Sequence, residues 1–234
     1  MDYCDKLTFK HLIEEHAKKM TYIPEEEILN YLAMITMGLA EMHRKFIIHF
    51  DLKPENIFLF GDKYVKIGDF GTSVSLGSDK NKVKKLVGTQ YYVSPEMLDG
   101  EPCNMSTDIW SLGVILYQLI QLHLPFDASN LIDLSSKIRR GIPAVPFQQM
   151  KCSQQLKEIV QWLLEPDPSK RPTAVQLLEH SLLKERAQRL FMQVPPSLRL
   201  VDEKLIYVRP GEEKDDINKY QLNMGQHLHG IQYI

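Results

Sequence analysis

Apolar residues recur at helical spacing along much of this chain, and the longest such stretch covers residues 24–44. Pro24 and the three glutamates that follow it suit the first turn of a helix, because proline loses no hydrogen bond there and acids face the positive end of the helix dipole. The apolar positions then repeat every three or four residues: Ile28, Tyr31, Leu32, Ile35, Leu39 and Met42. We therefore expect a buried core helix here.

Shorter stretches with the same spacing predict further helices over residues 6–19, 130–140, 156–164 and 173–183. Residues 106–117 start with a capping residue, Ser106, and are apolar on nearly every face, which indicates a fully buried helix. Residues 57–60 and 64–67 flank the turn residues Gly61-Asp62 and predict a β-hairpin. The expected fold class is mainly α (α+β), helical with short β-hairpins.

Composition narrows the class of protein. The chain has 234 residues, 44% of them hydrophobic, and a net charge of −2, which suits one globular domain with or without a tail. No basic stripe with interleaved aromatics predicts nucleic-acid binding, and we find no membrane-spanning segment or signal peptide. The three cysteines, Cys4, Cys103 and Cys152, are far apart, which argues against a disulfide framework or zinc site. We expect a cytoplasmic, or at least intracellular, protein.

The candidate chemistry is concentrated between His49 and Gly71. Asn56 and Asp69 lie on either side of the expected hairpin, so their oxygens can meet and bind a hard cation such as Mg²⁺. Asp51 is then free to orient a hydroxyl group and accept its proton, while Lys53 meets phosphate charge. This set of residues predicts phosphoryl transfer.

The same stretch resembles the protein-kinase family, whose patterns are H-R-D-L-x-x-x-N and D-F-G. Here His49-Phe50-Asp51-Leu52-Lys53-Pro54-Glu55-Asn56 is followed by Asp69-Phe70-Gly71 and then by Ser94-Pro95-Glu96, which is similar to the A-P-E element. Lys53 is typical of the serine/threonine branch. The motifs Asn56-Ile57-Phe58-Leu59 and Gly88-Thr89-Gln90-Tyr91-Tyr92 are most similar to the NIMA-related kinases. The resemblance covers residues 1–184 and implies ATP and Mg²⁺ as cofactors.

The resemblance also implies a nucleotide site. Met1 falls at the gatekeeper position of the linker between the two kinase lobes. Asp2 and Cys4 would bond the adenine ring through their backbone groups, and Phe58 would form the floor of the adenine pocket. The alternative for the first four residues is a frayed terminus.

Two further roles follow from the resemblance. Thr89 would hydrogen-bond Asp51 and Lys53 and hold them in place. Asp108 would accept backbone amide bonds from the loop that contains Asp51, or act only as the first-turn acid of its helix.

A structural pair is implied as well. Glu96 would form a buried ion pair with Arg171.

The chain departs from the family in its first part. No G-x-G-x-x-G loop, V-A-I-K lysine or helix C glutamate precedes the catalytic loop, so the small lobe is expected to be missing. We divide the chain into an interlobe hinge remnant over residues 1–4, a kinase C-lobe over 5–184 and an unassigned, partly disordered extension over 185–234. Within that extension, residues 189–192 are interpreted as linker and 205–208 as a short strand.

The second departure is Phe50, because the family usually has an arginine there that binds a phosphorylated residue. Phenylalanine cannot donate a hydrogen bond or carry charge, and Lys85 stands where related kinases often carry the phosphorylated Ser or Thr. We therefore expect the usual phosphorylation switch to be missing. In the alternative, Phe50 only repacks the loop and activity survives.

Two functions remain open. One is a serine/threonine kinase catalytic region that acts on ATP and a protein substrate. The other is a non-catalytic, pseudokinase-like lobe that binds another kinase or a regulatory protein through the exposed surface, including Phe58, that would face a small lobe. Without the phosphate clamp we expect no measurable turnover from this chain alone. A third possibility is that Met1 is an internal start and the small lobe lies upstream.

Overall fold

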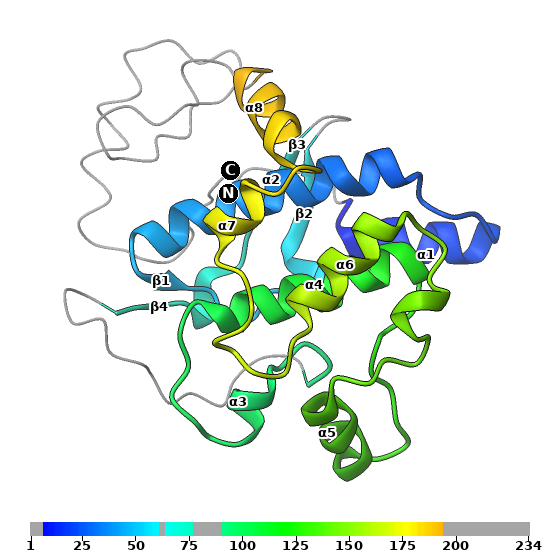
Figure 1. Ribbon diagram of the computed structural model, residues 1–234, viewed down its shortest axis with the longest axis vertical. Helices are drawn as coiled ribbons and strands as arrows, with labels where there is room; N and C mark the ends of the chain where they lie inside the picture. The colour runs from blue at the N-terminus through cyan, green and yellow to red at the C-terminus, as the bar shows by residue number, and fades with distance from the viewer. Residues whose placement is uncertain (1–6, 61–63, 77–89, 194–234) are drawn as a thin grey trace.

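The computed structural model describes residues 7–60, 64–76 and 90–193 (Figure 1). The helices of these residues are α1 (Phe9–Lys19), α2 (Glu25–Arg44), α3 (Pro95–Leu98), α4 (Ser106–Gln121), α5 (Leu131–Arg140), α6 (Gln154–Leu163), α7 (Ala174–Leu178) and α8 (Lys184–Gln193). The strands are β1 (Ile47–Ile48), β2 (Ile57–Phe60), β3 (Tyr64–Ile67) and β4 (Val74–Ser75), and short 3₁₀ turns lie at η1 (Pro54–Asn56), η2 (Phe70–Thr72) and η3 (Phe147–Gln149). The prediction of a mainly helical fold with short antiparallel strands is confirmed.

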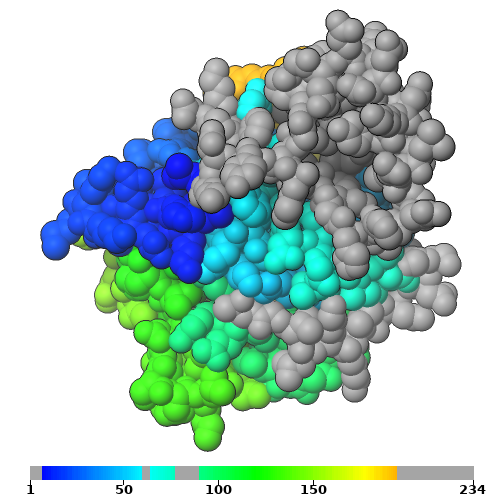
Figure 2. Space-filling view, turned by 180° about the vertical axis from the view of Figure 1, so that it is seen from behind, coloured from blue at the N-terminus to red at the C-terminus, as the bar shows by residue number. Residues whose placement is uncertain are grey.

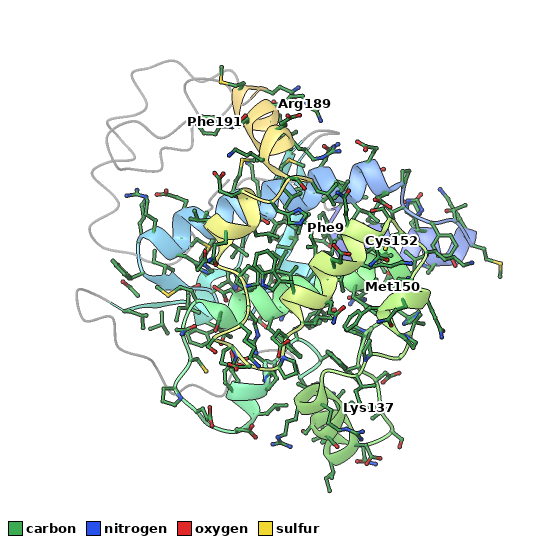
Figure 3. All side chains as sticks on the ribbon, viewed as in Figure 1. Phe9, Lys137, Met150, Cys152, Arg189 and Phe191 are labelled. Atoms are coloured by element: carbon green, nitrogen blue, oxygen red, sulfur yellow. The ribbon has the colours of Figure 1, made fainter. Side chains whose placement is uncertain are left out.

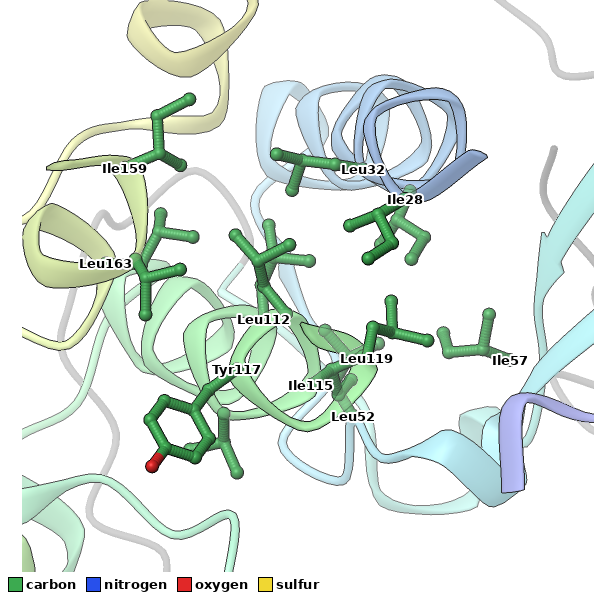
Figure 4. Packing of buried hydrophobic residues seen from close by; sticks show 14 of the residues in the cluster. Ile28, Leu32, Leu52, Ile57, Leu112, Ile115, Tyr117, Leu119, Ile159 and Leu163 are labelled. Atoms are coloured by element: carbon green, nitrogen blue, oxygen red, sulfur yellow. The ribbon is translucent and has the colours of Figure 1, made fainter. Parts of the chain in front are cut away.

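Helix α4 forms the centre of the core, as its apolar sequence predicts, and packs against α2 and α6. Its buried positions occupy almost every turn and face, from Thr107 to Ile120. Figure 4 shows Leu112 of α4 between side chains of α2, such as Leu32, and side chains of α6, such as Leu163. The core is therefore built around a helix that has no solvent-facing side.

A glycine permits the close contact between α4 and α6. A Cβ atom at Gly113 would lie 2.8 Å from Cβ of Leu163 and 2.9 Å from Cδ2 of Leu164. Real Cβ atoms do not approach other carbon atoms so closely, so any larger residue would push the two helices apart.

Helix α2 follows its sequence signals closely. Pro24 precedes it, Glu25, Glu26 and Glu27 occupy its first turn, and His43 lies in its last turn, where a basic group is favoured. Helix α5 ends as predicted at Gly141, whose φ of 60° is in the left-handed region that glycine adopts at low cost.

The predicted hairpin is confirmed, and the structure gives its register. Strand β2 pairs antiparallel with β3, Ile57 opposite Ile67 and Phe60 opposite Tyr64. The short pair β1–β4, with Ile47 opposite Ser75, was not predicted, because two residues are too few to produce a sequence pattern. The turn at Gly61-Asp62 lies outside the described residues.

Three sequence interpretations are corrected. Ser106 does not cap α4: the N-cap residue is Met105, and the side chain of Asn104 accepts the hydrogen bond from the Ser106 amide at 2.8 Å. The predicted last helix over 173–183 ends at Leu178. Residues 189–192, interpreted as linker, are helical and belong to α8.

Residues 189–192 are helical because α8 packs against the rest of the protein. Arg186 of α8 donates hydrogen bonds to Asn30 and Glu26 of α2, both at 2.7 Å, and Ala187 is buried in the main core. Helix α8 contains few strong apolar signals, so its stability depends on this packing rather than on its own pattern. Figure 3 shows Arg189 and Phe191 near the carboxyl end of α8. The expected strand over 205–208 lies outside the described residues.

Candidate active site

The segment between β1 and β2 brings three of the predicted residues together. Lys53 Nζ donates to Asp51 Oδ2 at 2.6 Å, and Asn56 Nδ2 donates to the backbone oxygen of Asp51 at 2.8 Å and to its Oδ2 at 3.3 Å. The Asn56 residue is only 5% exposed, whereas the side chains of Asp51 and Lys53 are 11% and 20% exposed. The Asp51 carboxylate therefore lies between a cation and an amide and is only slightly exposed.

The hairpin returns the chain to the same place. Because Ile57 is opposite Ile67, the residues that flank this pair meet, and the Gly68 amide donates to the Asn56 backbone oxygen at 2.9 Å. Asp69 follows directly, in the left-handed region with φ 61° and ψ 72°, and its Oδ1 accepts from the Gly71 amide at 3.4 Å. Asn56 and Asp69 thus lie at the same end of the hairpin.

The donor set at this end suits one kind of cation. Among the described residues, no group of three or more His, Cys, Asp and Glu side chains is placed so that it could hold a metal ion. One amide oxygen and one carboxylate are the sparse oxygen ligands that Mg²⁺ uses when waters and phosphates complete its shell. Because the side-chain nitrogen of Asn56 donates a hydrogen bond to Asp51, the side-chain oxygen is the atom that could coordinate a cation.

Asp108, in the first turn of α4, accepts hydrogen bonds from the loop that contains Asp51. Its Oδ1 accepts the Phe50 amide at 3.0 Å, and its Oδ2 accepts the His49 amide and lies 2.9 Å from His43 Nε2. Burial alone would raise the pKa of Asp108, but the hydrogen bond from His43, the electrostatic interactions with the His43 and His49 rings, and the hydrogen bond from the His49 amide hold it below its ordinary value. The amide bonds expected of Asp108 are present.

His49 connects the loop to the segment after the hairpin. Its Nδ1 accepts from the Asp51 amide at 3.3 Å, so Nε2 carries the proton and donates to the Gly68 carbonyl at 3.0 Å. Thr72 Oγ1 donates to the His49 carbonyl at 3.0 Å, and the Phe70 ring meets the His49 ring edge-on at 5.1 Å. His49 is completely buried. Sequence reasoning assigned no role to His49 or His43. Their partners Gly68 and Asp108 lie far along the chain and come close only in the folded protein.

Phe58 lies beside this site. Its ring contacts the Gly68 backbone so closely that a Cβ at Gly68 would be 2.7 Å from Phe58 Cε2. Phe58 also forms an isolated antiparallel bridge with Thr8, and the Leu59 amide donates to the Leu7 carbonyl at 2.8 Å. The chain before α1 therefore runs along β2. Figure 2 shows this region, in cyan, next to the blue surface of α1.

The predicted pair of Glu96 and Arg171 is present and buried. Both Arg171 terminal nitrogens donate to Glu96 oxygens at 2.8 Å, and Thr107 Oγ1 donates to Glu96 Oε1 at 2.9 Å. Burial raises the pKa of Glu96, but the hydrogen bonds and charge of Arg171, together with a backbone hydrogen bond and the hydrogen bond from Thr107, hold it below its ordinary value. This pair ties α3 to the segment before α7 and does not contact Asp51 in the hydrogen bonds of the described residues.

Several predicted residues lie outside the described part of the chain: Met1, Asp2, Cys4, Lys85 and Thr89.

Cys103 and Cys152 are both free thiols. In the described residues every helix is too short or too polar to cross a membrane.

Comparison with known proteins shows which family this chain resembles in sequence. The chain matches the family model "Protein kinase domain" over residues 1–183. It is 37% identical to serine/threonine-protein kinase Nek2 of Homo sapiens over 189 residues, which cover 78% of this chain and 42% of that protein. It is 34% identical to serine/threonine-protein kinase Nek3 of Mus musculus over 232 residues, which cover 97% of this chain and 44% of that protein. The chain thus spans less than half the length of these relatives.

Proposed function

This chain belongs to the protein kinase domain family, in its NIMA-related serine/threonine branch, and from that premise we propose that it carries the catalytic lobe of an ATP-dependent kinase that phosphorylates protein Ser or Thr. The observation that supports this most is the hydrogen-bonded set of Asp51, Lys53 and Asn56 beside Asp69. A purely structural loop would have no need to hold a partly exposed carboxylate between a lysine and a buried amide.

Each residue of the set has a chemical role in the proposal. Asp51 accepts the proton of the substrate hydroxyl as the oxygen forms a bond to the γ-phosphorus of ATP and the bond from that phosphorus to the β-phosphate oxygen breaks, leaving ADP. Lys53, held 2.6 Å from the same carboxylate, neutralises charge on the transferred group. The amide of Asn56 fixes the orientation of Asp51.

The proposed metal ligands are Asn56, through its side-chain oxygen, and Asp69. A bound Mg²⁺ would neutralise phosphate charge and orient the γ-phosphoryl group. The contribution of the chain is to bring the two ligands to one end of the hairpin through the pairing of Ile57 and Ile67 and the bond from Gly68 to Asn56.

For the nucleotide base we propose Phe58 as the floor of the pocket, which its contact with the Gly68 backbone supports. Met1, Asp2 and Cys4 remain proposed adenine contacts, and Thr89 remains a proposed partner of Asp51 and Lys53. The proposed partners are ATP, a protein substrate and another kinase or regulatory protein at the surface around Phe58, with neither nucleic acid nor membrane among them. The proposed location is cytoplasmic.

We expect no measurable turnover from these 234 residues alone, because their sequence contains neither the glycine-rich loop nor the β3 lysine that hold the phosphates. The second candidate is a non-catalytic lobe that binds a partner. The observation in its favour is Phe50, which occupies the position of a phosphate-binding arginine and is buried among apolar side chains.

Calorimetric titration with Mg·ATP tests the first proposal without requiring turnover. We expect measurable binding by the wild-type chain, and at least about tenfold weaker binding by Asp69→Asn, because a charged ligand of the cation is lost. The matched control is Asp127→Asn, the same chemical change at an exposed aspartate before α5.

The outcomes separate the candidates. Binding that requires Mg²⁺, that Asp69→Asn weakens and that Asp127→Asn leaves unchanged supports the nucleotide site. No binding by any of the three proteins supports the non-catalytic lobe. Transfer of labelled γ-phosphate at about 1–100 s⁻¹ by the chain alone would show that the phosphate clamp is dispensable and would overturn our expectation about turnover.

A further inference from the structure

Helix α8 is attached to the rest of the protein mainly by polar contacts. Ala187 is the single buried residue among its ten, whereas α6, which has the same length, buries Leu156, Ile159, Val160 and Leu163. An isolated helix of ten residues is not stable in water, so α8 depends on being docked. The match to the kinase family model ends directly before this helix.

Arg186 forms the main connection between α8 and α2. Its two terminal nitrogens donate to Asn30 Oδ1 and Glu26 Oε2, both at 2.7 Å. The Arg186 side chain is only 12% exposed, whereas that of Glu26 is 78% exposed. Arg186 Nε is buried and has no acceptor among the described residues, which is unfavourable for the docked helix. The docking of α8 therefore depends on the two bonds of this Arg186 clasp.

The carboxyl end of α8 reaches the β2–β3 hairpin. Tyr64 Oη, at the start of β3, donates to the Gln193 carbonyl at 3.4 Å, and β3 packs along α2. Figure 1 shows α8 next to α2 and to the start of β3. Tyr64 pairs with Phe60, and the same two strands run to the bond between the Gly68 amide and the Asn56 carbonyl. One helix thus contacts both α2 and the hairpin that carries the proposed metal ligands at its other end.

We propose that α8 is a strap that opens and closes on α2, that the Arg186 clasp holds it closed, and that the closed strap restrains the β2–β3 hairpin. Segments that bury little apolar surface open locally at a low free energy, so the strap opens more often than the core helices α2 and α4. A consequence for Asn56 and Asp69 as metal ligands rests on the proposed function, whereas the mechanical link does not.

Hydrogen exchange reports on the strap and on the hairpin separately. The Ala187 amide donates to the Leu183 carbonyl at 2.7 Å within the strap, and the Gly68 amide donates to the Asn56 carbonyl at 2.9 Å in the hairpin. We expect Arg186→Gln to increase exchange at Ala187 by about tenfold or more, because two hydrogen bonds from a charged group are lost. Exchange at Gly68 should increase by about threefold or more, because the hairpin loses its restraint.

The matched control is Arg189→Gln, which makes the same chemical change on the same helix at an exposed position. We expect this variant to leave exchange at Ala187 and Gly68 as in the wild type. The Leu164 amide, which donates to the Val160 carbonyl at the end of α6, should be unchanged in both variants if the effect is local.

Salt provides a second measurement of the clasp. Raising the salt concentration is expected to increase exchange at Ala187 more in the wild type than in Arg186→Gln, because only the wild type has the ion pair with Glu26 to be screened. Should Arg186→Gln not fold, Glu26→Gln tests the same clasp at a largely exposed side chain and should increase exchange at Ala187 by about threefold.

The outcomes separate the parts of the proposal. Equal exchange at Ala187 in Arg186→Gln and Arg189→Gln, or a wild type without a salt response, would overturn the clasp. Faster exchange at Ala187 with wild-type exchange at Gly68 would show that the strap opens without affecting the hairpin, and would overturn its restraining role. Since no readout requires nucleotide, failure of Mg·ATP binding would reject the proposed function and leave this test intact.

Discussion

The substitution Asp108→Asn tests whether one buried carboxylate holds the Asp51 loop in place. Asp108 is completely buried and accepts three hydrogen bonds, from the amides of Phe50 and His49 and from His43. Asparagine has the same shape, but only one of its two terminal atoms can accept a hydrogen bond. The variant therefore removes acceptor capacity and charge without creating a cavity.

The hydrogen bonds of Asp108 determine how much stability the Asp108→Asn variant is expected to lose. In the less costly orientation the amide nitrogen replaces Oδ1, so the Phe50 amide loses its acceptor, whereas Oδ2 continues to serve His49 and His43. An unsatisfied buried donor costs about 1–3 kcal/mol, and the two remaining bonds each lose about 1 kcal/mol of charge assistance. We expect a loss of about 3–5 kcal/mol in the free energy of unfolding. The melting temperature should then fall by about 6–20 °C in a chain of this length.

Urea denaturation at neutral pH and at acid pH is the assay. The pKa of Asp108 lies below its usual 3.8, so the ionised carboxylate contributes stability above pH 3.8 and loses it as the pH falls through the lowered value. The difference between wild type and Asp108→Asn should therefore shrink on acidification below pH 3.8. The exposed Asp127→Asn is the control and should change stability by less than about 0.5 kcal/mol.

A loss below about 1 kcal/mol in Asp108→Asn at neutral pH would refute the reasoning, because it would mean that the loop amides find other partners at no cost. A difference that stays constant down to the lowest pH would contradict the assignment of the effect to an ionised carboxylate.

Two further predictions concern the scaffold. Glu96→Gln should lower the free energy of unfolding by about 3–5 kcal/mol, because it leaves Arg171 buried without its charged partner, and a urea midpoint equal to that of wild type would contradict this. Gly113→Ala should destabilise by about 1–3 kcal/mol despite alanine's better helix propensity, because its Cβ would lie 2.8 Å from Leu163 Cβ. A melting temperature above that of wild type would show that α4 and α6 separate at no cost.

Local signals predicted the elements that position the site. The three glutamates after Pro24 and the regular apolar spacing behind them predicted α2 to within one residue, since both signals act inside the helix itself. The hairpin of β2 and β3 was predicted with correct bounds, because a short turn between two apolar runs fixes which residues face each other. The spacing of Asp51, Lys53, Asn56 and Asp69 then pointed to one end of that hairpin.

Features that depend on contacts with distant parts of the chain were not predicted from the sequence. Helix α8 is stabilised by Arg186 bonding to Asn30 and Glu26, which lie far away on α2, and its own residues carry little helical pattern. His43 and His49 were not singled out, because their roles come from Asp108 and Gly68, which they reach only after the chain has folded.

The sequence by itself determined which chemical groups the chain presents and how they are spaced, because spacing on a helix or a short hairpin is a property of neighbouring residues. Only the tertiary structure decided what holds them: Asp108 accepts the amide of His49 from 59 residues along the chain, and the Phe50 ring is buried against α3. A buried amide or an unfavourable backbone angle is stable only when some other part of the protein supplies its partner. Which part does so depends on how the helices pack, and no local pattern records it.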